Sequence, residues 1–361
     1  MLARRVDYLL GLVFDVAGMG EVVGFVEEAC NRGPGIPEYM VTVNFDYVVK
    51  SLSDCAFREA VLGANMSCPD GMSIIWLMSF LGLPHKGRVS GSDILPDLMR
   101  RKLSREYTSF IFGSTEETAK AAVERINRGG GSLRAVGYVC PPFLPAEDLS
   151  DEKYIRRIND SKADILLISL NSAKAMKWIA LNRKKLDVKL ICPVGAAVDF
   201  LAGKPRRAPK WMQDMCLEWL WRLIHDPSLA GRYAADGAVL AYLFVRRILP
   251  YKLFLMSHRH GPDELGGLDI RTVEDGGKIT VVAAGFMTER NLDKTRSILG
   301  EVLGKKADVV FDFGSLRMID SPSLGVLTLV NASMSEMGRR ASIGAESKTF
   351  RKIADYAMFN L

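Results

Sequence analysis

Two charged residues in the first quarter of the chain have the side chains that acid–base and phosphate chemistry need. Asp70 lies in the run Pro69-Asp-Gly71, and Arg88 follows it before the next apolar segment. A carboxylate at a strand edge can remove a proton from an alcohol, and a nearby arginine can neutralise a diphosphate leaving group. Both residues also have structural alternatives. Asp70 could be a turn residue, because Pro-Asp-Gly is a common turn sequence, and Arg88 could be an ordinary surface arginine.

Two further short motifs could contact a polar ligand. Thr42 and Asn44 are two positions apart in a β-prone run, so their side chains should point to the same side of a strand; Asn44 also fits a turn. Gly113 and Ser114 come between a strand and a helix, and a helix N-terminus there suits phosphate. Ser114 and Glu117 equally fit a capping box, which would be a purely structural role.

Several common site patterns are absent from the sequence. It contains no GxGxxG, no Walker A motif and no Asp-x-Asp, which argues against a dinucleotide oxidoreductase, a P-loop enzyme and a metal-chelated nucleotide-sugar site. The four histidines and six cysteines show no zinc-ligand spacing. We therefore expect no metal and no cofactor. We also expect reduced, mostly buried thiols in a cytoplasmic protein; the cysteines are Cys30, Cys55, Cys68, Cys140, Cys192 and Cys216.

The net charge of +6 is concentrated in one part of the chain. Residues 203–260 contain ten Lys or Arg and four Asp or Glu, whereas the part from Glu264 onward is neutral. Such a block suggests a phosphate-bearing ligand or an anionic membrane surface, with a solvated basic face as the alternative. No apolar run is long enough to span a membrane and no signal peptide is evident, and nothing resembles a nucleic-acid module, so we expect no nucleic-acid partner.

Alternating segments along the first part of the chain must position these residues. Strands are expected at 41–44, 107–112, 163–170 and 188–192, and helices at 116–128 and 173–183. The 361 residues suit two domains. The alternation predicts a Rossmann-like α/β fold with a mostly parallel sheet and helices on both faces. In such folds ligands bind at the carboxyl ends of the strands.

The pattern changes after residue 256. The polar, Gly- and Pro-containing stretch 257–267 is expected to be a linker. Beyond it we expect a small α/β domain, with strands at 278–283, 308–313 and 340–344 and helices at 289–303, at 322–337 and from 347. Just before the linker, the apolar and basic stretch 238–254 fits an interfacial helix, or alternatively a core helix.

Six motifs follow one another in a distinctive order. They are Thr42-x-Asn44, Pro69-Asp-Gly71, Arg88-Val-x-Gly91, Gly195-Ala-Ala-Val-Asp199, Arg207-Ala-Pro209 and Glu218-Trp-Leu-Trp-Arg222. This order closely resembles the WecG/TagA/CpsF glycosyltransferases over about residues 5–250. The resemblance implies an inverting, metal-independent enzyme that moves an N-acetylmannosamine-type sugar from a UDP donor to a polyprenyl-diphosphate-linked sugar. It would act in surface polysaccharide assembly, peripherally on the inner face of the cell membrane, with homo-oligomers possible.

The same resemblance implies roles for individual residues. Asp70 would be the catalytic base, and Arg88 would face the diphosphate. The implied substrate-binding residues are Thr42 and Asn44 in the sugar pocket, Gly113, Lys174, Asp199 in the nucleotide pocket, and Arg222 and Arg232 in a membrane-proximal appendage at about 217–256.

Two departures from the family pattern support a second hypothesis. Where the family has a Gln-Glu pair after the central strand, this chain has Ala175-Met176, and an appendage arginine is replaced by Leu229. The missing glutamine normally touches the donor, so its loss would weaken a transferase. The alternative function is a catalytically degenerate scaffold that binds a nucleotide sugar or lipid intermediate and signals through its C-terminal domain.

The C-terminal part resembles a STAS domain, the anti-anti-sigma-factor-like fold. The motif is Asp320-Ser-Pro-Ser-Leu-Gly325 within residues 309–327. Ser321 occupies the phosphoacceptor position of regulatory members, although Ser321 as N-cap and Pro322 at N1 would also simply start a helix. We thus expect a transferase domain at 1–256, a linker at 257–267 and a STAS domain at 268–361 that regulates activity or recruits a protein partner. In the scaffold hypothesis, the protein would signal through this STAS domain.

Overall fold

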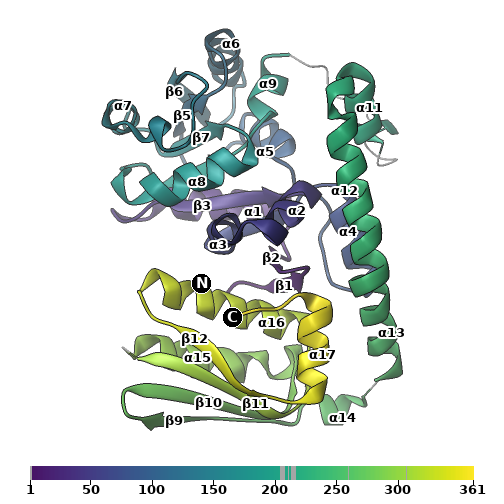
Figure 1. Ribbon diagram of the computed structural model, residues 1–361. Coiled ribbons are helices and arrows are strands. Elements are labelled where there is room, and N and C mark those ends of the chain that lie inside the picture. The colour runs from purple at the N-terminus through teal and green to yellow at the C-terminus, as the bar shows by residue number, and fades with distance from the viewer. Residues whose placement is uncertain (1, 204–207, 210, 213–216, 259, 306) are drawn as a thin grey trace. The chain divides into compact units, whose positions relative to one another are not determined.

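The computed structural model describes residues 2–203, 208–209, 211–212, 217–258, 260–305 and 307–361. Its contacts divide the chain into two compact units, each made of segments that are distant in sequence. The first unit comprises residues 17–75 and 86–237, and the second comprises residues 1–16, 76–85 and 238–361. Figure 1 shows the chain and labels many of its helices and strands. The boundaries at 256 and 268 expected from the sequence stay a prediction.

The first unit is built on a parallel sheet. Among its described residues the sheet has six strands in the order β4-β3-β8-β7-β5-β6, and the strand pairs are parallel. This confirms the predicted α/β class with a mostly parallel sheet. The strands are β3 (Glu38–Val43), β4 (Met66–Pro69), β5 (Tyr107–Gly113), β6 (Leu133–Val139), β7 (Ile165–Ser169) and β8 (Leu190–Pro193).

Helices cover both faces of this sheet (Figure 1). In β7, Ile165 and Leu167 belong to the core formed with α1, α5, α6 and α9, while Leu166 and Ile168 are equally buried on the other side. This two-sided burial explains why the strand sequence is continuously apolar. The helices are α1 (Met19–Asn31), α2 (Phe45–Ser53), α3 (Cys55–Leu62), α5 (Gly91–Leu98), α6 (Glu116–Asn127), α7 (Glu152–Asp160), α8 (Ser172–Asn182), α9 (Ala197–Leu201) and α11 (Glu218–His225).

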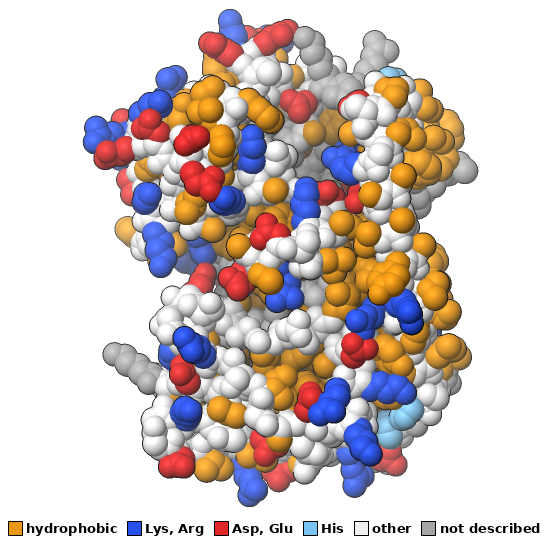
Figure 2. All heavy atoms as spheres, viewed as in Figure 1, with side chains coloured by type: hydrophobic (Ala, Val, Ile, Leu, Met, Phe, Trp, Pro, Cys, Tyr) orange, Lys and Arg blue, Asp and Glu red, His pale blue; other side chains and the backbone are white. Residues whose placement is uncertain are grey.

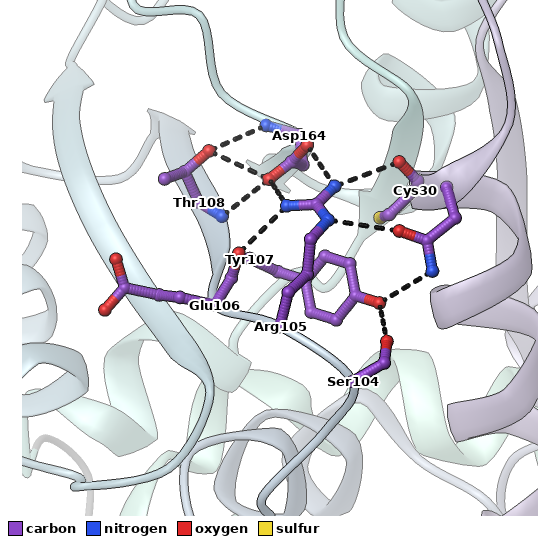
Figure 3. A network of polar contacts seen from close by, with 8 residues as sticks. Cys30, Ser104, Arg105, Glu106, Tyr107, Thr108 and Asp164 are labelled. Atoms are coloured by element: carbon purple, nitrogen blue, oxygen red, sulfur yellow. Dashed lines mark hydrogen bonds and ion pairs between the residues drawn. The ribbon is translucent and has the colours of Figure 1, made fainter.

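A charged network fastens the amino ends of β5 and β7 (Figure 3). The guanidinium of Arg105 donates to both carboxylate oxygens of Asp164, at 2.9 and 2.8 Å, and to the carbonyl of Cys30 at 3.0 Å. Asp164 also accepts from the backbone N–H of Thr108. This network lies at the amino edge of the sheet, opposite the strand ends at which ligands bind in α/β folds. We therefore assign it a structural role.

The second unit contains a short hairpin and a mixed sheet. Strands β1 (Val6–Leu9) and β2 (Leu12–Asp15) form the antiparallel hairpin. Among the described residues the sheet has the order β12-β11-β10-β9, with β9 antiparallel to β10 and the other pairs parallel. Its elements are β9 (Leu268–Asp275), β10 (Lys278–Met287), α15 (Leu292–Gly304), β11 (Asp308–Ile319), α16 (Ser321–Glu336), β12 (Ala341–Glu346) and α17 (Lys348–Ala357). The strands and helices expected here from the sequence are therefore present.

The hairpin packs directly on α16 and α17. A Cβ added at Gly325 of α16 would lie 2.9 Å from a methyl carbon of Val6, so only glycine allows this close approach. The Tyr8 hydroxyl donates to the carbonyl of Met358 at 3.0 Å. The cap of α16 differs from the expectation: Asp320, not Ser321, is the N-cap, and its carboxylate accepts from the N–H of Ser323. Ser321 is free of the capping role because the helix begins at Ser321, one residue earlier than expected.

The helical stretch expected at 238–254 is present but interrupted. It comprises the end of α12 (Ala230–Leu243), a π-helical segment (Phe244–Ile248) and α13 (Leu249–Ser257). Pro250 at the start of α13 lacks an N–H and crowds the preceding turn, which accounts for the irregular segment before it. In the part of the chain that the structure describes, no helix combines the length and apolarity needed to cross a bilayer. The short helix α14 (Pro262–Leu265) lies in the expected linker.

Candidate active site

Asp70 lies immediately after β4, at the carboxyl edge of the parallel sheet. Its backbone N–H donates to the carbonyl of Val43 at 2.8 Å, which ties it to the end of the neighbouring strand β3. Gly71 has a positive φ of 94° and turns the chain into α4 (Met72–Leu81). The carboxylate predicted at a strand edge is therefore at the edge where α/β folds bind ligands.

Two arginines and two further carboxylates surround this position. Arg88, in the loop before α5, donates to Oδ2 of Asp93 and to Oε2 of Glu218, both at 3.1 Å. Arg222, one helical turn beyond Glu218 on α11, donates to Oε1 of Glu218 at 2.8 Å. The structure thus brings Arg88 and Arg222 together although 130 or more residues separate Arg88 from α11.

The surroundings of Asp70 tune its acidity. Burial raises its pKa to about 7, and the carboxylates of Glu218 and Asp93 act in the same direction against the opposing charges of Arg88 and Arg222. A base whose pKa lies near the working pH combines ionisation with proton affinity. For Arg88, burial would lower the pKa, but Asp93, Asp70 and Glu218 outweigh it and raise the pKa. Arg88 therefore stays cationic.

A second polar pair lies beyond the end of β5. Ser114 donates from its hydroxyl to Oδ1 of Asp199 at 3.1 Å, and burial raises the pKa of Asp199 against this hydrogen bond. The predicted capping box of Ser114 and Glu117 is wrong. Thr115 caps α6 instead, accepting from the N–H of Thr118 at 3.3 Å, because Ser114 adopts a left-handed φ of 63° that aims its hydroxyl elsewhere.

The structure explains the glycine at position 113 and shows the surroundings of Thr42. Gly113 has a φ of 105°, and a Cβ there would lie 2.4 Å from the carbonyl oxygen of Ser169. Thr42 lies on β3 and lines a mainly apolar cavity of about 10 Å³. That volume suits at most about one water molecule. Any sugar contact of Thr42 must therefore be made outside this cavity.

Asn44 lies one residue beyond the end of the strand that was expected to include it. Strand β3 ends at Val43, and Asn44 is the N-cap of α2, where its side-chain oxygen accepts from the N–H of Tyr47 at 3.3 Å. Asn44 still lies beside Asp70, since the Cβ of Asn44 is 3.6 Å from where a Cβ on Gly71 would be. Because the side-chain oxygen of Asn44 caps the helix, its amide nitrogen is the group that is suited to bind a ligand.

The segment that departs from the family pattern is folded into α8. Lys174 places its ammonium 3.6 Å from the ring centre of Phe143. Ala175 and Met176 are both buried, with 1% and 0% of their surface exposed. These two side chains contribute to the core and so have no access to a ligand.

Arg232 belongs to a different group of charges on α12. It is exposed, and its guanidinium lies 5.3 Å from the ring centre of Tyr233. It acts electrostatically on Asp236, together with Asp46 and Lys50 of α2. The structure therefore places Arg232 over α2 rather than in the cluster of Arg88, Glu218 and Arg222.

Sequence reasoning did not assign site roles to Asp93 and Glu218. Glu218 opens the motif that ends at Arg222, four residues later, and this helical spacing indicates an ion pair. Asp93 lies two residues beyond the motif Arg88-Val-x-Gly91, and no local spacing indicated its pair with Arg88. Arg207 of the Arg207-Ala-Pro209 motif and the cysteine Cys216 lie outside the described residues. Within the described part of the chain, no three His, Cys, Asp or Glu side chains are grouped so as to hold a metal ion, and the five cysteines described there are free thiols, of which Cys55 is exposed.

Comparison with known proteins decides the family. Residues 7–253 match the sequence profile of the glycosyl transferase WecG/TagA/CpsF family. The chain belongs to this family. The transferase is also 23% identical over 231 residues to proteins named N-acetylglucosaminyldiphosphoundecaprenol N-acetyl-beta-D-mannosaminyltransferase from Staphylococcus aureus strains MRSA252, MW2 and NCTC 8325. Each match covers 63% of this transferase and 87% of the relative. The prediction of a glycosyltransferase is thereby confirmed.

Proposed function

We propose that this transferase moves an N-acetylmannosamine-type sugar from a UDP donor to a polyprenyl-diphosphate-linked N-acetylglucosamine. The names of the S. aureus relatives support the sugar and the acceptor, because those enzymes act on N-acetylglucosaminyldiphosphoundecaprenol. Residues 7–253, which match the family, contain all the charged groups around Asp70. The product would enter assembly of a surface polysaccharide.

The observation that carries this proposal is the place of Asp70 at the carboxyl edge of the sheet, where the charges of Arg88 and Arg222 act on its carboxyl group. In the proposed step, Asp70 takes the proton of the acceptor hydroxyl as that oxygen bonds to the anomeric carbon. The bond from that carbon to the UDP oxygen breaks, and its electron pair leaves with UDP. A single displacement from the opposite face inverts the anomeric configuration.

Arg88 and Arg222 are suited to the leaving group. Guanidinium groups form charge-assisted hydrogen bonds to diphosphate oxygens and stabilise the charge that develops there. This arrangement supplies cationic stabilisation from side chains alone, so the proposed reaction needs no metal. We assign the donor sugar to the vicinity of Thr42 and Asn44, and the nucleotide to the region of Gly113, Lys174 and Asp199, with Arg232 binding the substrate from α12.

We further propose that the enzyme works at the inner surface of the cell membrane. Large apolar side chains are exposed along α12, the π-helical segment and α13, namely Tyr242, Val245, Leu249, Leu253 and Met256. Figure 2 shows hydrophobic side chains gathered there, with basic side chains among them. An exposed apolar strip with basic neighbours suits an interface of anionic headgroups and acyl chains.

For the C-terminal region we retain the proposal of a STAS module that recruits a partner or responds to a modification. The candidate phosphoacceptor Ser321 is 5% exposed, and its hydroxyl is hydrogen-bonded to the β1 strand. A kinase could reach it only after β1 leaves α16. Regulation through Ser321 would therefore have to couple modification to release of the hairpin.

One observation favours a second candidate function, a scaffold that binds the nucleotide sugar or lipid intermediate without turnover. Ala175 and Met176 offer no polar group to a donor, and both are buried. The ion pairs of Arg88 and Arg222 would still hold a diphosphate in such a protein.

The test is UDP release from a panel of UDP-N-acetylhexosamines with a polyprenyl-diphosphate-N-acetylglucosamine analogue and lipid vesicles. Acceptor-dependent release that Asp70→Asn lowers by about a hundredfold or more would support the transferase. Asp164→Asn, in the network at the opposite edge of the sheet, is the control for general damage. UDP-sugar binding without release, from any donor, would favour the scaffold.

A further inference from the structure

Glu218 joins the two arginines that face Asp70. Its Oε2 accepts from Arg88 at 3.1 Å and its Oε1 accepts from Arg222 at 2.8 Å, so each carboxylate oxygen binds one guanidinium. The three side chains are 18%, 20% and 38% exposed, in the order Glu218, Arg88 and Arg222. The pairs are therefore shielded from bulk water more than typical surface ion pairs.

The bridge connects two segments that are far apart in the sequence. Arg88 lies in the loop before α5, whereas Glu218 and Arg222 lie on α11. Two guanidinium groups repel each other, and a carboxylate between them removes this repulsion. Asp93 holds Arg88 at 3.1 Å and also accepts from the Ser90 hydroxyl at 2.7 Å. Asp93 holds Arg88 within its own part of the chain, whereas Glu218 links Arg88 to Arg222.

We propose that Glu218 is a positioning residue, which holds Arg88 and Arg222 in the arrangement that the leaving diphosphate requires. The inference rests on the proposed function. Glu218 touches neither reacting atom in this scheme and acts through the two arginines. Loss of the bridge would leave both arginines charged but no longer held together, and a misplacement of about 1 Å can lower a rate about a hundredfold.

Glu218 also contributes to the charge balance at Asp70. The groups that act on the Asp70 carboxyl are Arg88, Arg222, Glu218 and Asp93, and Tyr47 interacts with it from α2. Glu218 and Asp93 disfavour its ionised form. Removing the charge of Glu218 should therefore let Asp70 ionise at lower pH. This shift in the ionisation of Asp70 distinguishes a role for the charge of Glu218 from a purely structural role for its side chain.

The experiment compares Glu218→Gln, Glu218→Asp and Asp93→Asn in the full chain with vesicles present. We expect Glu218→Gln to lower kcat by about tenfold to a hundredfold, without weakening the Kd of the UDP-sugar measured by calorimetry. The acid limb of its pH profile should move to lower pH. Glu218→Asp keeps the charge and should leave that limb in place. Asp93→Asn releases one arginine and should lower kcat less.

A Glu218→Gln variant with kcat within twofold of the wild type and an unmoved acid limb would overturn the inference. A fall in kcat matched by an equal loss of UDP-sugar affinity would also overturn it, because Glu218 would then serve binding. If the wild type shows no turnover, the proposed function fails on its own. The inference is then judged by carboxyl NMR of Asp70: an unchanged pKa in Glu218→Gln overturns it, and a lowered pKa supports the charge coupling.

Discussion

Ser321 and Asp7 are hydrogen-bonded at 2.9 Å although 314 positions separate them in the sequence. The Ser321 hydroxyl also accepts from the N–H of Tyr8 at 2.7 Å. Asp7 is 1% exposed, and its second carboxylate oxygen has no hydrogen-bond partner. The hairpin and α16 are thus joined through a buried acid, and the stability of this junction should depend on pH.

The first prediction concerns the pH dependence of unfolding. Burial raises the pKa of Asp7 from 3.8 to about 7, with Asp320 and Glu289 adding to the rise and Ser321 and Arg5 opposing it. Between these values the folded state binds more protons than the unfolded state, so stability falls as pH rises. We expect Asp7→Asn to remove a pH-dependent loss of up to about 4 kcal/mol. Urea unfolding at pH 4.5 and about pH 8 measures this.

Asp70 provides the matched control for that measurement, because its pKa is raised to the same value. Asp70→Asn should remove its own share of the pH dependence and leave that of Asp7. If the free energies of unfolding of the wild type and of Asp7→Asn changed equally with pH, Asp7 would not titrate in this range.

The second prediction concerns a negative charge at Ser321. Ser321→Asp would place a carboxylate beside Asp7 in a buried site, and an unpaired buried charge is strongly destabilising. We expect hydrogen exchange of residues 6–15 to rise about tenfold or more, because the hairpin separates locally. Ser342→Asp, on the exposed side of β12, should leave exchange in the hairpin unchanged. Equal exchange in both variants would mean that the hairpin accommodates the charge.

The third prediction tests the turn after β5. Gly113→Ala forces a Cβ to within 2.4 Å of the Ser169 oxygen at a φ of 105°. We expect a loss of about 2 kcal/mol or more in the free energy of unfolding. Gly20→Ala in α1 has open space around its added Cβ and should stabilise slightly. Thermal or urea unfolding distinguishes the two variants, and equal stability would contradict the assigned backbone strain.

The fourth prediction tests the apolar strip on α13. Leu253 is 55% exposed there, and Val273 of β9 is 48% exposed. Leu253→Glu should lower sedimentation with anionic vesicles about tenfold, since burying a charge in the acyl region is costly. Val273→Glu should have no effect, because β9 is outside the strip. Equal binding by both variants would mean that α13 does not contact the bilayer.

Much of the fold followed from local patterns. The alternation of strand-like and helix-like segments predicted a sheet covered on both faces, and helix α8 was expected within one residue of its observed limits. Ser114 and Thr115 both precede α6, and either hydroxyl could cap a helix. The sequence does not show which one does, so the cap was assigned to Ser114 although Thr115 provides it. The sequence around Val6 carries no strong alternation, so the β1–β2 hairpin was not expected at all.

Some residues of the candidate site were expected from the sequence, and others were not. Asp70 and Arg88 were singled out because their motifs belong to a distinctive order of six motifs, although each short motif alone is common. Glu218 was not given a role, because its ion pair with Arg88 is a contact across 130 positions that no local spacing reveals. The burial of Ala175 and Met176 was equally inaccessible, since only the packing of α8 determines which side of the helix faces the core.

The pairing of the first strand with the last helices has a consequence for biosynthesis. At roughly 5–20 residues per second, the 314 positions between Asp7 and Ser321 correspond to about 15–60 s of translation. Leu9, Leu12 and Phe14 of the hairpin are almost fully buried in the finished protein, yet they emerge from the ribosome before α16 has been synthesised. The nascent chain therefore exposes an apolar hairpin for this period, and it should be a substrate for ribosome-associated chaperones until its C-terminal partner arrives.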